Sequence, residues 1–415
     1  LDRFLIVGST LRKDHPLLAL RLRNAVRWGA GMNLINPVTE DYLCKVANRA
    51  IVSPDGMVAA LAALVRALAE AKQESVPAAA ANAVVTPDIK AIADSMAGGE
   101  KKAVFIGNLA QHHPRFAEMV TLAQDVALLS GAKLGLLGDS GNGLGAIAAG
   151  AIPGRSVMGH LGVTGMNAAE MITNTRKAYV LLGAEPELDC HDASAALRAM
   201  QQAGFVVALS AYKHAATDYA DVLLPIAPFT ETAGSFINIE GRVQAFHAAV
   251  KPLAEARPAW KVLRVLGNLL NLAGFEQNTC EEVRDEALGK DAQASVARLL
   301  NNRIEPVAIS SARAGGIERI GEVPIYQTDA IVRRAASLQR TADAASPSAK
   351  ASGMLLERLG ISGGGMAIVR QGQGSVVIRI DCDDCLPDNC VRLPGAHAVT
   401  QALGPLFGDV TVERA

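Results

Sequence analysis

The run from Tyr219 to Phe246, YADVLLPIAPFTETAGSFINIEGRVQAF, constrains the fold of this chain more than any other stretch. It opens with an apolar segment that Pro225 ends, because proline has no N–H to donate to a sheet. Small and polar residues follow at once, including Glu231, Asn238, Glu240, Gly241 and Arg242. In α/β proteins, ligands usually bind where a strand leaves the sheet at its carboxyl end. The run therefore predicts a buried strand that passes into a candidate binding loop.

Strands and helices alternate through the first two thirds of the chain. The segments expected to be strands are residues 4–7, 34–37, 104–107, 133–137, 179–183 and 205–209. The expected helices begin after His15-Pro16 and after Asp55-Gly56, and they also cover residues 116–129 and 193–202. This order predicts doubly wound α/β domains with parallel sheets. We expect residues 1–80 to form the first domain and residues 81–300 the second.

The last part of the chain has a different pattern. Residues 340–353 have the composition of a loop. Short apolar runs follow it without helical periodicity, at residues 366–370, 375–380, 391–393 and 410–412. Short strands separated by turns are typical of a compact barrel. We therefore expect residues 301–415 to hold a linker and a small C-terminal β-barrel-like domain.

Charge and composition restrict the class of protein. Forty basic residues against forty-one acidic ones leave a net charge of -1, which gives no indication of a nucleic-acid partner. No apolar run reaches the ~20 residues that a membrane-spanning helix needs, so a soluble segment without direct membrane insertion is expected. Six cysteines without an export signal indicate reduced thiols. Because the chain starts with Leu1 directly before a strand, we expect it to be a piece of a longer protein.

Family resemblance is carried by several stretches. The segments ADVLLP and ETAGSFINIEGRVQ resemble the molybdopterin oxidoreductase superfamily, of the formate dehydrogenase/DMSO reductase type. Together with PAWKVLRVLGNLLNLAGF at 258–275, these segments most resemble the large iron–sulfur subunit of bacterial respiratory complex I, NADH:quinone oxidoreductase. The opening RFLIVGST and the late VPIYQTDAIVRRAASLQ are similar to the same family. The resemblance implies the C-terminal, molybdopterin-oxidoreductase-like part of that subunit.

The resemblance also implies a function and partners. The whole complex transfers electrons from NADH to quinone, whereas this segment would be mainly structural, with no catalytic residue of its own. It would dock other complex I subunits on the cytoplasmic face of the inner membrane. The 4Fe-4S and 2Fe-2S clusters of the parent subunit would belong to an N-terminal part that this chain lacks, so no cofactor is expected here. The alternative is a catalytic molybdopterin-dependent oxidoreductase such as a formate dehydrogenase.

A remnant of a pterin-type site is expected on the same grounds. Gly8-Ser9-Thr10 and Gly183-Ala184-Glu185-Pro186 resemble the two strand-end loops that hold the pterin dinucleotide in molybdenum enzymes. Working enzymes tend to carry Asn where this chain has Glu185, and a carboxylate repels a pyrophosphate, which argues against molybdopterin binding. The candidate cofactor-binding residues are Gly8, Gly183, Glu185, Glu231, Asn238, Glu240, Gly241 and Arg242. For the loop with Glu231, Asn238, Glu240 and Arg242, the favoured alternative is a carboxylate–arginine pair that fixes this loop.

Two further patterns remain open. Residues 141–146 fit G-x-G-x-x-A, but no acidic residue follows at the required offset, so close packing is favoured over a dinucleotide site. A chemically suitable set of ligands for zinc or an iron–sulfur cluster is formed by Cys382, Cys385 and Cys390 with His397. A second C-x-x-C pair is missing, so surface thiols without a metal are the favoured interpretation. We assign no role to the histidines at 112, 113 and 214.

Overall fold

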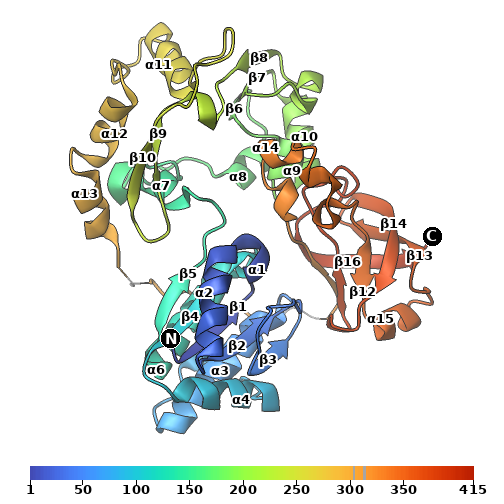
Figure 1. The fold of residues 1–415 in the computed structure, drawn as a ribbon. Helices are drawn as coiled ribbons and strands as arrows, with labels where there is room; N and C mark the ends of the chain where they lie inside the picture. The colour runs from blue at the N-terminus through green and yellow to red at the C-terminus, as the bar shows by residue number, and fades with distance from the viewer. Residues whose placement is uncertain (302–303, 312–314) are drawn as a thin grey trace. The chain divides into compact units, whose positions relative to one another are not determined.

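The computed structural model of the chain describes residues 1–301, 304–311 and 315–415. It divides into two compact units, which Figure 1 shows coloured along the chain. The first unit combines residues 1–139, 302–328 and 335–415, and the second combines residues 140–301 and 329–334. Each unit is therefore built from segments that lie far apart in the sequence.

The first unit contains a five-stranded parallel sheet with the order β3-β2-β1-β4-β5. Its strands are β1 (Arg3–Val7), β2 (Gly31–Asn36), β3 (Asn48–Ile51), β4 (Lys102–Ile106) and β5 (Lys133–Leu136). The expected domain boundary at residue 80 falls inside this sheet, because β4 pairs with β1 across that boundary. All the predicted strands of this region form, whereas β3 was missed because it is only four residues long and contains Asn48 and Arg49.

Helices cover both faces of this sheet because β1 is apolar on both sides. Leu5 and Val7 pack into a core shared with α3 (Gly56–Lys72), α4 (Pro87–Ala97) and α6 (Phe116–Ser130). Phe4 and Ile6 point to the other face and share a core with Leu22 of α2 (Pro16–Arg27). Two short helices, α1 (Leu11–Asp14) and α5 (Asn108–Gln111), follow the carboxyl ends of β1 and β4. The doubly wound prediction is confirmed for this sheet.

A closed six-stranded barrel belongs to the first unit and confirms the predicted C-terminal domain. Its order is β11-β15-β12-β14-β13-β16. The strands are β11 (Ile317–Ile320), β12 (Ala349–Ala351), β13 (Gly365–Gln371), β14 (Gly374–Cys382), β15 (Cys390–Arg392) and β16 (Phe407–Arg414), with α15 (Gly353–Arg358) following β12. The barrel contains β12 inside the segment that was expected to be loop. Three residues with an exposed lysine between two alanines give no apolar pattern that would predict a strand.

The second unit has a smaller parallel sheet with the order β6-β7-β8. Its strands are β6 (Ala178–Leu182), β7 (Phe205–Ser210) and β8 (Val222–Pro225). The strand at 222–225 was expected to be buried, but it is only partly buried, because it lies at the edge of the sheet with one neighbour. Helix α10 (Ala193–Gln202) forms as predicted, and Asp192 caps it, since its carboxylate accepts a hydrogen bond from the N–H of Ala195.

The rest of the second unit is a hairpin with surrounding helices. Strands β9 (Gly234–Ile237) and β10 (Val243–Phe246) pair antiparallel. The helices are α7 (Gly143–Ala148), α8 (Ala168–Thr173), α9 (Pro186–Asp189), α11 (Ala259–Leu269), α12 (Cys280–Leu288), α13 (Ala292–Leu299) and α14 (Ala330–Arg333). No helix in the described ranges is both long and apolar enough to cross a membrane.

Candidate functional site

The first candidate loop follows β1. Gly8 has φ +55°, and a Cβ at this position would lie 2.7 Å from the backbone nitrogen of Ala110, so only glycine fits. The N–H of Ser9 donates to Oδ1 of Asn36 at 2.8 Å, and the N–H of Thr10 donates to Oδ1 of Asn108 at 2.9 Å. The two strand-end N–H groups that follow the glycine are therefore occupied by asparagine side chains of the chain itself.

Ionisable groups surround this loop. The hydroxyl of Thr10 donates to the carboxylate of Asp14, and burial raises the pKa of Asp14. His112 pairs with Asp139, and this hydrogen bond raises the pKa of the imidazole. Burial also raises the pKa of Glu40 to about 7, so this carboxyl group titrates near neutral pH. The charges at this edge of the sheet are thus acidic or paired, which is unfavourable for an anionic ligand.

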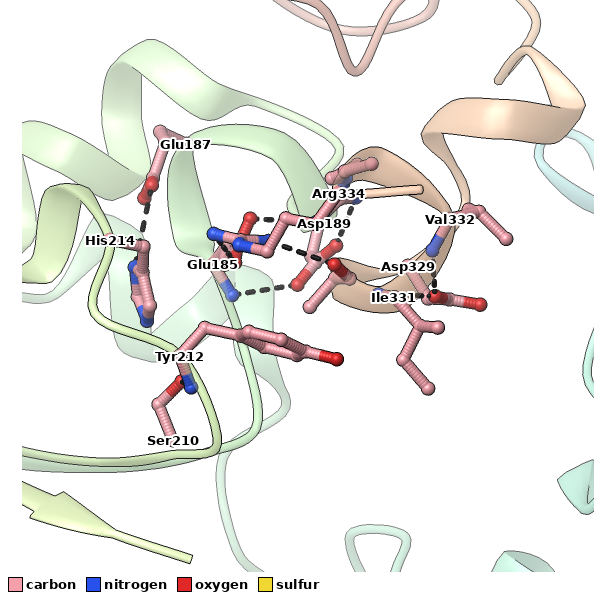
Figure 2. A network of polar contacts seen from close by, with 12 residues as sticks. Glu185, Glu187, Asp189, Ser210, Tyr212, His214, Asp329, Ile331, Val332 and Arg334 are labelled. Atoms are coloured by element: carbon pink, nitrogen blue, oxygen red, sulfur yellow. Dashed lines mark hydrogen bonds and ion pairs between the residues drawn. The ribbon is translucent and has the colours of Figure 1, made fainter. Parts of the chain in front are cut away.

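The second candidate loop follows β6 and contains Glu185. Gly183 has φ +62° and turns the chain out of the strand. The side chain of Glu185 is buried, with 3% of the residue exposed. Its Oε2 lies 3.2 Å from Nη1 of Arg333, and its Oε1 lies 2.7 Å from Nη2 of Arg334. The carboxylate at the strand end is therefore held between two guanidinium groups of α14 and the residue after it, as Figure 2 shows for Arg334.

Asp189 completes the charge balance of this cluster. Its Oδ1 lies 2.6 Å from Nη2 of Arg333, and its Oδ2 accepts a hydrogen bond from the N–H of Glu185 at 2.7 Å. The cluster of Glu185, Asp189, Arg333 and Arg334 thus contains two carboxylates and two guanidinium groups. We refer to these four residues as the strand-end ion cluster. Its two positive charges are already neutralised by the chain's own carboxylates.

The segment that supplies the arginines is fixed in place at several points. Asp329 caps α14, because its Oδ1 accepts hydrogen bonds from the N–H groups of Ile331 and Val332. The guanidinium of Arg334 lies 4.8 Å from the centre of the Tyr212 ring, beyond the end of β7. Segment 329–334 therefore contacts the loops that follow β6 and β7, at the edge where an α/β sheet usually binds its ligand.

Buried polar groups continue from α9 toward β8. The hydroxyl of Tyr219 donates to Oε2 of Glu187 at 3.0 Å, and burial raises the pKa of Tyr219. Burial also raises the pKa of the Cys190 thiol to about 11, so this thiol is protonated at neutral pH. The Nδ1 of His214 accepts a hydrogen bond from the N–H of Ala216 and lies 4.0 Å from Oε1 of Glu187. These contacts fix the loop after β7, and no nucleophile–base pair results from them.

The remaining candidate residues lie on the β9–β10 hairpin. Oδ1 of Asn238 accepts hydrogen bonds from the N–H groups of Glu240 and Arg242, which closes the turn. Oε2 of Glu231 accepts a hydrogen bond from the N–H of Leu253. Arg242 forms no ion pair with a carboxylate in the described part of the chain. The carboxylate–arginine pairing expected on this loop is thus found instead at Glu185, whose partners were missed by the sequence reasoning.

Packing explains Gly241 of the hairpin and Gly145 within residues 141–146. A Cβ on Gly241 would lie 2.5 Å from Leu300, and its carbonyl accepts a hydrogen bond from the side chain of Gln293. A Cβ on Gly145 would lie 2.0 Å from the side chain of Asn142, whose Oδ1 accepts the N–H of Ile237. A short helix of six residues, α7, begins within these glycines. Gly145 and Gly241 serve close packing of the hairpin.

The cysteines of the barrel do not form a metal site in the described structure. Cys382 and Cys385 are exposed, whereas Cys390 is buried at the start of β15. No group of three or more His, Cys, Asp or Glu side chains among the described residues is arranged to hold a metal ion. The sulfur of Cys382 instead contacts Oδ1 of Asp384 at 3.5 Å.

The chain is similar to curated proteins of two classes. A subunit of the NADH-quinone oxidoreductase of Mycobacterium bovis is 29% identical over 273 residues, which cover 60% of this chain and 30% of that protein. The mitochondrial NADH-ubiquinone oxidoreductase 78 kDa subunit of Candida albicans is 43% identical over 67 residues, or 16% of this chain and 9% of that protein. A putative formate dehydrogenase of Staphylococcus aureus is 36% identical over 80 residues, or 19% of this chain and 8% of that protein. The chain thus spans less than a third of the length of these relatives.

The fold and the family are shown by two further comparisons. The structure of acetylene hydratase from Pelobacter acetylenicus superimposes with a TM-score of 0.68 over 100% of this chain and 78% of that chain, at 13% sequence identity, which shows a shared fold. The family model for molybdopterin oxidoreductase matches residues 2–269, which is more than half of the chain. The strands and the strand-end loops described above lie largely within these residues. The chain belongs to the molybdopterin oxidoreductase family.

Proposed function

We propose that this chain is a structural, non-catalytic part of a large subunit of NADH:quinone oxidoreductase, in which it supports neighbouring subunits. The similarity to the Mycobacterium bovis NADH-quinone oxidoreductase subunit over 60% of the chain supports this assignment over the formate dehydrogenases, whose similarity covers 19% to 21%. Electron transfer from NADH to quinone would be the activity of the whole complex. Its iron–sulfur clusters would be held by other parts of the parent subunit.

The strand-end ion cluster is the single observation that carries the non-catalytic interpretation. A pterin dinucleotide would bring its pyrophosphate to this edge of the sheet, next to the buried carboxylate of Glu185, and like charges at short range repel. Arg333 is already bound to Glu185 and Asp189, so its charge is not free for a phosphate. In the first unit, the N–H groups of Ser9 and Thr10 donate hydrogen bonds to the side chains of Asn36 and Asn108. The residues present therefore do not fit the pterin, and we derive no chemistry through it.

Elemental mass spectrometry of the purified chain, with a fluorescence assay for released pterin, tests the proposal directly. We expect no stoichiometric molybdenum, tungsten, iron or zinc and no pterin. Pterin together with molybdenum or tungsten would overturn the proposal in favour of a catalytic oxidoreductase of the formate dehydrogenase class. Stoichiometric iron or zinc alone would contradict the proposal that the chain holds no metal. The candidate ligands would then be Cys382, Cys385 and Cys390.

A second experiment separates a structural role from a catalytic one. Glu185→Gln in the full-length parent subunit is expected to lower the amount of assembled complex in membranes. The NADH oxidation rate per assembled complex should stay within about twofold of the unchanged complex, because the residue touches no reacting group. Glu240→Gln, at an exposed position of the hairpin, is the matched control. A fall in turnover per assembled complex with normal assembly would contradict the proposal.

A further inference from the structure

Helix α11, yellow in Figure 1, has several exposed apolar side chains. Val265, Leu266, Leu269 and Leu270, which directly follows the helix, are all exposed, and Leu269 has 74% of its surface in contact with solvent. Only Gly267 of this helix is buried, where a Cβ would lie 2.3 Å from the ring of Phe275. An apolar stripe on one side of a helix is normally covered by protein. We therefore expect a protein partner to cover the exposed face of α11.

The apolar residues of this face form one continuous stripe. Val262, Val265, Leu266 and Leu269 have the spacing i, i+3, i+4 and i+7, which places them on one side of the helix. Leu263, Gly267 and Trp260 lie on the opposite side, where Gly267 meets Phe275. This pattern is the one by which an amphipathic helix packs against a second helix or a groove.

Cations border this stripe along one edge. Lys261 and Arg264 lie one helical turn apart, and Arg257 precedes the helix. None of the three forms an ion pair with a carboxylate in the described part of the chain. The Nε of Arg264 is buried and has no hydrogen-bond partner there, and Nζ of Lys261 lies 5.3 Å from the ring centre of Trp260. Together with Val262 and Val265, these side chains line a groove of about 520 Å³.

We propose that the apolar stripe of α11 and this cationic groove form the docking surface for an amphipathic helix of a partner subunit that carries acidic residues along one edge. The apolar stripe would supply most of the buried area, whereas the cations without a carboxylate partner would select the acidic edge and set the register. The inference rests on the proposed function, because it names the surface through which a structural segment would bind its neighbour.

Two other occupants fit the surface less well. An antiparallel pair of α11 helices about a two-fold axis would bring the cationic edges of both copies to the same side, where like charges repel. An anionic membrane is flat and would leave the groove that contains Arg264 and Trp260 unfilled. An acidic-edged helix satisfies the stripe and the groove together.

Fluorescence of Trp260 provides the test in the whole chain. The protein contains two tryptophans, and Trp28→Phe removes the other one, which is 91% exposed. Two synthetic amphipathic peptides with the same leucine stripe would be titrated, one with a glutamate edge and one with a lysine edge. We expect saturable binding of the glutamate-edged peptide and about tenfold weaker binding of the lysine-edged one, and salt should reduce this difference.

Charge reversal makes the test decisive. The double variant Lys261→Glu/Arg264→Glu, with folding checked by circular dichroism, is expected to reverse the preference in favour of the lysine-edged peptide. Lys290→Glu, at an exposed position outside the groove, is the matched control and should leave the preference unchanged. Equal binding of both peptides by the unchanged chain, or no binding of either, would overturn the proposal.

Two side measurements exclude the other occupants. Dimerisation that Leu269→Asn abolishes would overturn the proposal in favour of a second copy of this chain. Binding to vesicles of anionic lipid in preference to the glutamate-edged peptide would overturn it in favour of a membrane surface. Failure of peptide binding would not change the metal and pterin analysis of the purified chain, so the docking surface and the proposed function fail separately.

Discussion

Arg319 provides the sharpest prediction about the stability of the barrel. Its side chain is buried, with 1% of the residue exposed, and burial lowers the pKa of the guanidinium to about 10, so it stays charged at neutral pH. The guanidinium donates at 3.0–3.3 Å to the carbonyl oxygens of Leu393, Pro394, Gly404 and Pro405 and to the side-chain oxygen of Gln371. All of these acceptors are neutral groups. One cation thus holds three separate segments of the barrel together.

Arg319→Met is the perturbation. Methionine fills much of the volume but leaves these acceptors without a donor, and each buried acceptor that loses its partner costs about 1 to 3 kcal/mol. Removal of the buried charge returns several kcal/mol of desolvation free energy. We therefore expect the opening free energy of the barrel to fall by about 3 kcal/mol.

Alkylation of Cys390 measures this opening locally. Cys390 is fully buried in β15, beside the residues that Arg319 binds, whereas Cys382 and Cys385 are exposed and serve as references in the same peptide map. A loss of about 3 kcal/mol should accelerate labelling of Cys390 more than 100-fold, since each 1.4 kcal/mol is about tenfold. Arg370→Met, at an exposed barrel arginine, is the control and should change the rate by less than about fivefold. Unchanged or slower labelling in Arg319→Met would refute the reasoning and show that the desolvation cost dominates.

Three further substitutions test the strand-end regions, each by urea unfolding followed by circular dichroism. Gly8→Ala should destabilise the chain by about 2 kcal/mol or more, because the new Cβ would collide with the backbone of α5, whereas Gly131→Ala, at positive φ in open space, should cost about 1 kcal/mol. Burial raises the pKa of Glu40, so between pH 4.5 and about 7 the folded state holds a proton on this carboxyl group that the unfolded state has lost. The free energy of unfolding should therefore fall as pH rises through this window. Glu40→Gln should remove that pH dependence; a profile that it leaves unchanged would contradict this assignment. Glu185→Gln should cost about 3 kcal/mol because Arg334 loses its carboxylate and Arg333 keeps only Asp189, while Glu240→Gln should change stability by less than about 0.5 kcal/mol. Equal effects of the two substitutions would contradict the role of the ion cluster.

The sequence predicts most of the strands that the structure describes, but only four of its helices, α2, α3, α6 and α10, and the success with strands has a physical reason. Buried strands of parallel sheets are continuous apolar runs, as in Phe4–Val7 and Phe205–Leu209, and such runs stand out from their surroundings. Strands β11 and β12 are not predicted because they are short and carry charged residues. One of these residues is Arg319, whose burial depends on hydrogen-bond acceptors from distant segments. Local pattern carries no information about such long-range partners.

The same limit applies to the candidate site. The two strand-end glycines and Glu185 could be located from sequence because they directly follow apolar strands. The partners of Glu185 lie 148 and 149 positions later in the chain, so no local spacing connects them. A buried carboxylate does require a counter-charge, and the Arg333-Arg334 doublet at the end of a helix capped by Asp329 was the one available signal.

The placement of residues 329–334 has a consequence for how the polypeptide is made. The second unit consists of residues 140–301 and this short segment, and the chain returns to the first unit between and after them. During synthesis, Glu185 and Asp189 emerge from the ribosome long before the arginines that neutralise them, so the second unit stays incomplete until residue 334 is available. Neither unit corresponds to one contiguous stretch, and a fragment that ends near residue 301 would expose an uncompensated carboxylate at its strand end. Completion of the two units is thus coupled to translation of the last quarter of the chain.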